Sequence, residues 1–193
     1  MTEPMVRRTW HSCQPVDLHR LARRYFLHAR RIELQKLARE LGISRATAYR
    51  WAGSADQLVG EVLASLTRET FERLVKASED KEGRDRVLYV LNEGMRSAHE
   101  FPGLRRFLRK NPETGLKVVA SKDGPVQAAT MNSIRELLVQ ETQAGHLSLP
   151  VDPAVMAFAL TRMIESFLYA DVISGVEPDL DSASKILEIM LAP

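Results

Sequence analysis

Cysteine is nearly absent from this 193-residue sequence, which contains Cys13 alone. One thiol excludes a disulfide between two positions of the chain, and it falls short of a zinc site, which needs about three or four ligands. Long apolar runs are missing too, because Arg162 and Glu165 interrupt the most apolar stretch, residues 154–170. The first residues lack the apolar segment of a signal peptide. We therefore expect a cytoplasmic protein with no metal and no membrane partner.

Catalytic signatures are missing as well. The sequence has no nucleophile elbow, phosphate-binding loop, zinc-ligand spacing or dinucleotide fingerprint, and its five histidines are scattered. No catalytic residue and no cofactor are therefore predicted, and an enzyme is the disfavoured class. Sustained alternation of apolar and polar residues, the pattern of a half-buried strand, does not occur either. The sequence predicts an all-α protein.

Acidic residues are scarce in the first quarter of the chain. Residues 1–50 contain 11 Lys and Arg against 4 Asp and Glu, whereas residues 51–193 contain 16 against 21. The net charge of +2 thus hides a basic N-terminal part joined to an acidic remainder. Chance surface charge can give such a split, but it is also the distribution expected when only one end of a protein meets nucleic acid.

The stretch LQKLARELGISRATAYRWAGSADQL, from Leu34 to Leu58, has the pattern of two short helices joined by a turn. Apolar residues repeat at helical spacing over residues 34–41, and Gly42 follows where a left-handed cap residue is needed. Ser44 stands at the N-cap of a second helix, which Gly53 ends. Helix, glycine-containing turn and helix is the arrangement of a helix-turn-helix DNA reader.

The second helix carries side chains suited to a DNA groove. Small residues such as Ala46 and Thr47 allow close approach to base edges in the major groove, and Tyr49 and the arginines can reach phosphates or guanine. An ordinary helical hairpin with a solvated basic face is the alternative. The predicted DNA-binding residues are Ser44, Arg45, Ala46, Thr47, Tyr49 and Arg50.

This same stretch resembles the DNA-binding signature of TetR-type one-component repressors, and the similarity extends over roughly residues 16–66. The segment ATAYRW is similar to the sequence of the QsdR-type subgroup, regulators associated with lactone quorum-signal degradation. By position, the resemblance assigns Tyr49 to a phosphate-contacting tyrosine. The chain departs from the family pattern at Ala52, where Phe is usual, and at Ala55, where Lys is usual. We expect Trp51 to supply aromatic packing in place of the missing Phe, whereas the missing Lys removes one phosphate contact.

The organisation predicted from breakers and apolar spacing is two-part. Residues 1–53 form a three-helix helix-turn-helix domain that binds DNA, and residues 54–193 form a helical effector-binding and dimerisation domain. A long helix from Ser54 to about Ser78, opened by a Ser54–Gln57 capping box, links the two. The other predicted helices span residues 17–30, 85–100, 104–110, 113–121, 126–143, 154–174 and 180–191.

The last two predicted helices carry apolar stripes. Paired across a two-fold axis they would form a four-helix bundle, and a reader of palindromic DNA needs a symmetric partner. The resemblance implies the same, since TetR-like proteins generally dimerise through C-terminal helices. The alternative is that both stripes pack inside the monomer. The predicted interface residues are Met156, Leu160, Met163, Phe167, Ile186, Leu187 and Met190.

The middle helices are apolar but contain polar groups at helical spacing, as a small-molecule cavity requires. Arg162 and Glu165 are spaced to pair, either in that cavity or as a structural ion pair. The predicted ligand-binding residues are Asn92, Met95, His99, Met131, Arg135, Phe158, Arg162, Glu165 and Tyr169.

Together these features predict a transcriptional regulator. The expected partners are a palindromic double-stranded operator, a second copy of the chain and a small effector. The expected role is a repressor released by a mostly hydrophobic compound, for which the resemblance implies a lactone or acyl compound. The alternatives are a helical adaptor that binds only protein, which leaves the basic reader helix unexplained, and an activator with the same DNA-binding domain.

Overall fold

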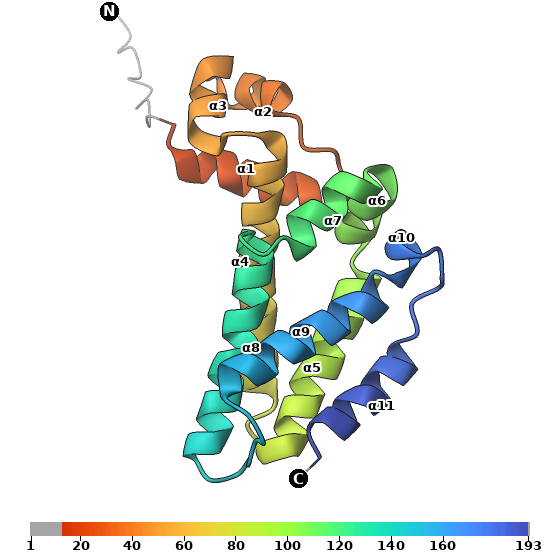
Figure 1. Ribbon diagram of the computed structural model, residues 1–193. Coiled ribbons are helices and arrows are strands. Elements are labelled where there is room, and N and C mark those ends of the chain that lie inside the picture. Colours follow the sequence, from red (N-terminus) through yellow and green to blue (C-terminus); the bar gives the residue numbers. More distant parts are fainter. Residues whose placement is uncertain (1–12, 193) are drawn as a thin grey trace, which may run out of the picture.

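The computed structural model describes residues 13–192, and this part of the chain is built from helices without any strand (Figure 1). The predicted all-α fold is therefore confirmed. Residues 1–12 of the predicted DNA-binding domain lie outside the described residues. The helices are α1 Pro15–Leu27, α2 Leu34–Leu41, α3 Arg45–Ala52, α4 Ala55–Ala77, α5 Gly83–Glu100, α6 Pro102–Lys110, α7 Pro112–Ala120, α8 Pro125–Gln143, α9 Pro153–Leu168, α10 Ala170–Ile173 and α11 Leu180–Met190.

Proline marks the beginning of five helices. Pro15, Pro102, Pro112, Pro125 and Pro153 each occupy the first helical turn. The missing N–H of proline costs nothing there, and its fixed φ suits the helix. The sequence prediction treated four of these prolines, all except Pro15, as breakers outside the helices. It began all five helices one or two residues late.

The predicted helix over residues 154–174 is two helices. Tyr169 leaves helical geometry at φ −109° and ψ 17°, so that α9 ends at Leu168 and the four-residue α10 follows. Apolar spacing alone missed this break, because the pattern continues through it.

One apolar core holds the N-terminal helices to the neighbouring part of the second region. It contains Leu37 and Ala48 of α2 and α3, and it continues into Leu63 of α4, Leu108 of α6 and Tyr169. In Figure 1, α1, α2 and α3 lie at one end of α4, with α6 and α7 beside them. α2 and α3 are therefore packed on residues that lie far away in sequence.

A second apolar core fills the opposite end of the molecule. It joins the last turns of α4, from Phe71, to α5, α8, α9 and α11. α4 contributes to both cores, with Leu58 in the first and Leu74 in the second. This helix was predicted from Ser54 to about Ser78 and is observed as Ala55–Ala77, with Ser54 Oγ accepting from the Gln57 amide.

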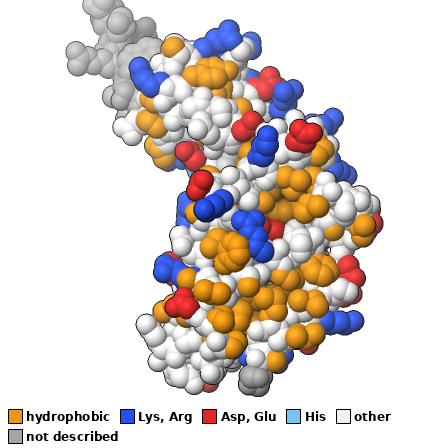
Figure 2. All heavy atoms as spheres, in the orientation of Figure 1, with side chains coloured by type: hydrophobic (Ala, Val, Ile, Leu, Met, Phe, Trp, Pro, Cys, Tyr) orange, Lys and Arg blue, Asp and Glu red, His pale blue; other side chains and the backbone are white. Residues whose placement is uncertain are grey.

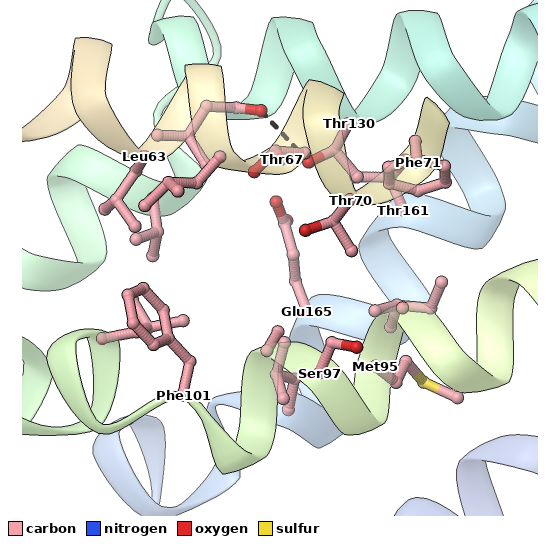
Figure 3. A pocket seen from close by; sticks show the side chains of 18 of the residues that line it. Leu63, Thr67, Thr70, Phe71, Met95, Ser97, Phe101, Thr130, Thr161 and Glu165 are labelled. Atoms are coloured by element: carbon pink, nitrogen blue, oxygen red, sulfur yellow. Dashed lines mark hydrogen bonds between the residues drawn. The ribbon is translucent and has the colours of Figure 1, made fainter. Parts of the chain in front are cut away.

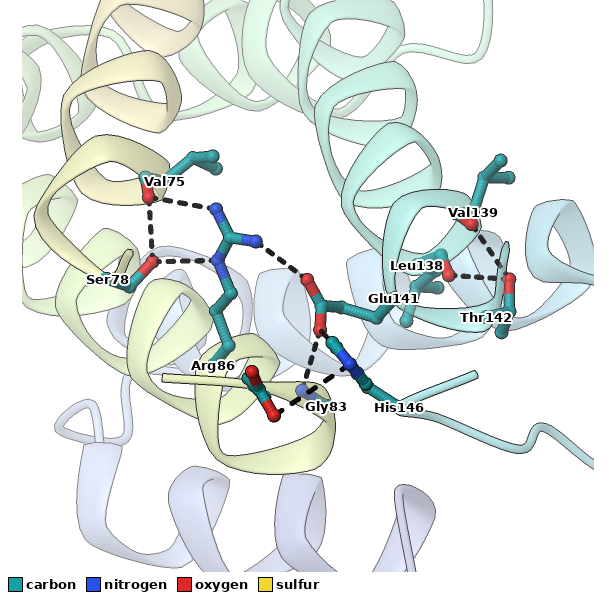
Figure 4. Close-up of polar contacts among 10 residues, drawn as sticks. Val75, Ser78, Gly83, Arg86, Leu138, Val139, Glu141, Thr142 and His146 are labelled. Carbon is teal, nitrogen blue, oxygen red and sulfur yellow. Dashed lines mark hydrogen bonds and ion pairs between the residues drawn. The ribbon is translucent and has the colours of Figure 1, made fainter. Parts of the chain in front are cut away.

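A buried ion pair lies at the end of the molecule farthest from α3. Glu141 of α8, with a side chain 2% exposed, accepts from Arg86 Nη1 at 2.8 Å and from the Gly83 amide at 2.6 Å (Figure 4). Arg86 also donates to the Val75 carbonyl of α4 at 3.2 Å. Gly83 has φ +55°, and a Cβ there would lie 2.2 Å from the His146 carbonyl oxygen. This network ties the ends of α4, α5 and α8 together.

Candidate nucleic-acid interface and ligand cavity

The turn between α2 and α3 has the predicted capping geometry. Gly42 adopts φ 67° and ψ 24°, the left-handed conformation that costs glycine nothing. Ser44 Oγ accepts from the Thr47 amide at 3.0 Å and lies 2.9 Å from Thr47 Oγ1. A single serine thus caps α3 and orients the threonine hydroxyl next to it.

α3 divides cleanly into an inner and an outer face. Ala48 and Ala52 are buried in the first core, while Arg45, Ala46 and Arg50 are exposed and Thr47 is half-buried. Tyr49 remains 46% exposed although it is a large aromatic residue. The helix contains no acidic residue. Its outer face offers two guanidiniums, a phenol and small side chains, the groups that contact phosphates and base edges.

The departures from the family pattern fall at the end of α3 and the beginning of α4. Ala52 is buried in the first core, and half-buried Trp51 packs against the same core. Ala55 opens α4 with no cationic side chain.

Side-chain contacts fix α1 behind the reading pair. Arg23 forms a two-pronged ion pair with Glu69 of α4, and this hydrogen bonding lowers the pKa of the Glu69 carboxyl. Tyr25 donates to Glu40 of α2 at 2.6 Å, and the Arg30 guanidinium lies 3.9 Å from the centre of the Tyr25 ring. α1 is therefore held to both α2 and α4, so that these contacts attach the helix-turn-helix, α1–α3, to the long helix.

A cavity of about 440 Å³ lies between α4, α5, α6, α8 and α9. Most of its wall is apolar, including Leu66, Phe71, Met95, Phe101 and Ile164. The polar residues that line it are Thr67, Thr70, Arg73, Ser97, Glu100, Thr130, Thr161, Glu165 and Tyr169. A cavity of this size, with an apolar wall and a few polar groups, is typical of a small-molecule site.

Of the two carboxylates that line this cavity, Glu165 is the more enclosed, because Glu100 is exposed. Figure 3 shows the Glu165 side chain pointing from α9 toward Thr67 and Thr70 of α4. The side chain is 12% exposed, and its Oε2 lies 2.7 Å from Arg162 Nη1. Burial raises the pKa of the Glu165 carboxyl in spite of this arginine. Burial, and next the Glu165 charge, hold the pKa of Tyr169 far above its usual range.

Three of the nine predicted ligand-binding residues line the cavity, namely Met95, Glu165 and Tyr169. The six others do not line it, so the expectation that all nine residues share one cavity needs correction. Arg135 and Phe158 are exposed, and Arg162 donates to Glu165, which lines the cavity, and to the Ala120 carbonyl, which does not. The remaining three are Asn92, His99 and Met131.

The sequence prediction also overlooked residues that line the cavity. Thr67 and Thr70 sit one turn apart in α4, a helix interpreted only as a mechanical link. Threonine is a poor helix former, so two threonines inside a long helix were a usable signal.

The predicted dimer interface needs a similar correction. Met156, Leu160 and Leu187 are 5%, 0% and 0% exposed in the second core, so they stabilise the protomer and present no surface to a partner. Met163, Phe167 and Met190 are partly buried against that core. The exposed apolar residues of α9 and α11 are Val155, Phe158, Ile186 and Ile189. Figure 2 shows hydrophobic side chains gathered on the face where α9 and α11 lie.

Residues 82–192 match the family model described as "Tetracyclin repressor-like, C-terminal domain". The chain belongs to the TetR family. It is thus a TetR-family transcriptional regulator, as the helix-turn-helix resemblance implied. Members of the TetR family bind operator DNA as homodimers and respond to small molecules. No curated protein matches the chain in sequence.

Solved structures of TetR-family proteins share this architecture. The transcriptional repressor QsdR from R. erythropolis is 26% identical, with a TM-score of 0.84 over 92% of this chain and 93% of its own. AlkX from Dietzia sp. strain DQ12-45-1b, implicated in biodegradation of n-alkanes, is 17% identical, with a TM-score of 0.63 over 93% and 94%. A TetR-family regulator from Rhodococcus sp. is 16% identical, with a TM-score of 0.54 over 92% and 98%. In the described part of this TetR-family chain, no helix is long and apolar enough to cross a membrane.

Proposed function

We propose that this TetR-family protein is a repressor that a small, mostly hydrophobic effector releases from its operator. Residues 1–53 read DNA, and residues 54–193 bind the effector and dimerise. The observation that carries this proposal is the 440 Å³ cavity, because α4 and α6 line it and both pack against the N-terminal helices, α4 against α1 and α3 and α6 against α1. An effector that fits one arrangement of α4 and α6 better than another shifts the balance between DNA-bound and free states.

The dimer places two copies of α3 one DNA turn apart, about 34–36 Å, on a palindromic operator. The apolar face around Val155, Phe158, Ile186 and Ile189 supports this pairing, since contiguous exposed apolar residues mark protein interfaces. A two-fold axis brings the same face of each copy together. The operator-bound unit is then a symmetric dimer whose halves meet through α9 and α11.

The charges of the cavity support a neutral polar head on the effector. Glu165 is the enclosed carboxylate, and the neighbouring threonines are neutral acceptors and donors. An amide N–H or hydroxyl of the ligand can donate to Glu165, whereas a ligand carboxylate is repelled by it. Arg73 and Glu100 are both exposed and of opposite charge, so they give the cavity no net preference for anions. An acyl lactone, which the similarity to QsdR-type regulators suggests, has an apolar tail and a neutral head.

Calorimetric titration tests this effector class. We expect an acyl homoserine lactone to bind at least about tenfold more tightly than its ring-opened carboxylate, a difference of about 1.4 kcal/mol. Glu165→Gln removes the repelling charge and should therefore reduce the difference in affinity between the lactone and its ring-opened carboxylate. Equal affinity of the wild-type protein for both forms would contradict the assignment of Glu165 to the ligand head. Failure of every lactone and acyl compound to bind or to release operator DNA would refute the proposed effector class.

A further inference from the structure

A second cavity, of about 480 Å³, lies on the other side of α6 from the effector cavity. Its wall comes from the end of α1, the segment joining α1 to α2, the first turns of α4, and α6 with the beginning of α7. The lining residues include apolar Phe26, Ile32, Val59 and Phe107. It therefore lies at the joint between the reading unit and the rest of the protein.

The charges around this second cavity are strongly one-sided. Arg30, Arg31, Arg106 and Lys110 line it, against the single carboxylate of Asp56. Among the described residues, none of these four cations has a carboxylate within the 4.0 Å of an ion pair. All four are exposed, and the Arg30 guanidinium lies over the Tyr25 ring. Four cations brought together from α6 and the α1–α2 segment repel one another, and an anion bound between them would relieve this repulsion.

The two cavities share α6 as a common wall. Leu27, Phe101 and Leu104 line the effector cavity, while Phe26, Gly103 and Phe107 line the second one. The Phe26 ring packs edge-on against Phe101 and Phe107, with ring centres 5.6 Å and 6.2 Å apart.

The backbones of α1 and α6 also approach closely. A Cβ at Gly103 would lie 2.4 Å from the Phe26 carbonyl oxygen, so only glycine allows this approach. Whatever fills the second cavity therefore touches the same α1–α6 contact that borders the effector cavity.

From this arrangement we infer that the second cavity binds a small organic anion, with its apolar part on Phe26 and Phe107 and its anionic group between Arg30, Arg31, Arg106 and Lys110. The most suitable chemistry is an aryl or alkyl phosphate, because guanidinium groups bind phosphate oxygens in pairs. The bound anion holds α6 against α1. The binding of this anion does not depend on the proposed effector.

DNA phosphates are the competing occupant of these cations. No residue of α3 lines the cavity, and its wall is formed by the elements that join the two regions. An apolar floor is also of no use to a DNA backbone. The placement therefore favours a free small anion.

Titration of the full chain with phenyl phosphate, in the absence of DNA, tests the inference. We expect saturable one-to-one binding, weaker binding of inorganic phosphate, and none of phenol. Arg106→Gln and Lys110→Gln should each lower the affinity for phenyl phosphate about tenfold, which is the effect of losing one charge-assisted hydrogen bond. Arg109→Gln is the matched control, because Arg109 is exposed on the same helix but does not line the cavity. Its affinity should be unchanged.

Two outcomes would overturn the inference. If Arg109→Gln weakened phenyl phosphate binding as much as Arg106→Gln and Lys110→Gln do, the effect would come from overall charge and not from a defined site. Undetectable phenyl phosphate binding, together with a reduced salt slope of DNA binding in Arg106→Gln, would assign these cations to the DNA backbone. Both results leave the effector proposal standing, because lactone binding is measured separately on the same protein.

Discussion

Single hydroxyl groups on α3 differ in their surroundings, and this difference predicts different roles. Tyr49 is 46% exposed on the outer face, where the family resemblance assigns it to a phosphate. Tyr49→Phe removes one sequence-independent hydrogen bond. It should weaken operator and scrambled DNA alike, by about 0.5–1.5 kcal/mol. Fluorescence anisotropy with both duplexes at several salt concentrations measures the effect, and a loss confined to the operator would contradict the assignment.

Thr47 lies on the same helix as Tyr49 but is half-buried, and its hydroxyl lies 2.9 Å from Ser44 Oγ. Thr47→Ala should cost mainly operator affinity, at most about 1–3 kcal/mol, and should relax preference at one base pair per half-site. The salt slope should hardly change, since no charge is lost. Arg45→Ala is the comparison: if Arg45 neutralises a phosphate, the slope should fall by about one unit. Equal weakening of both duplexes by Thr47→Ala would remove Thr47 from base reading.

At the scale of elements, the junction of α4, α5 and α8 depends on one carboxylate. Glu141→Gln would leave Arg86 buried without its counter-charge, since the Arg86 side chain is only 11% exposed. We expect the free energy of unfolding to fall by about 3–5 kcal/mol. Urea denaturation measures it, with Glu136→Gln on the exposed side of α8 as the control, expected within about 0.5 kcal/mol of wild type. A Glu141→Gln variant as stable as the control would mean that Arg86 finds another partner.

The helical elements were predictable where the signals are local. Gly42 and Ser44 define the turn and the cap through their own backbone preferences, so the helix-turn-helix was visible without any tertiary information. The break at Tyr169 was not, because the apolar spacing of the helix continues past this residue and no proline or glycine marks the break.

Cavity residues were predicted less well because their placement depends on which helix packs on which face. Met95 lines the cavity, but Asn92 and His99 on the same helix do not. Likewise Phe158 and Leu160 are only two positions apart in α9, yet one is 50% exposed and the other fully buried. Helical spacing finds the stripes, but the neighbours that cover each stripe are known only from the fold.

For the whole molecule, the proposed dimer predicts different effects of substitution at two nearby residues of α11, Leu187 and Ile189. Ile189 is 70% exposed, so Ile189→Asp should leave the protomer folded and convert dimers to monomers. Leu187 is fully buried, and Leu187→Asp should unfold the protein instead. Sedimentation velocity and circular dichroism separate these results. A folded dimer of Ile189→Asp would remove this part of α11 from the interface.

The first apolar core has a consequence for protein engineering. Chimeric regulators are usually planned by joining one protein's DNA reader to another's sensor, and Gly53 looks like a natural junction here. Such a cut would separate Ala48 from Leu63, Leu108 and Tyr169, with which it shares a core. The graft would expose apolar surface on both pieces unless the first half of α4 and the inner faces of α6 and α7 were redesigned to match. The DNA reader of this protein is therefore not a portable module, and its specificity is better exchanged by rewriting the outer face of α3 alone.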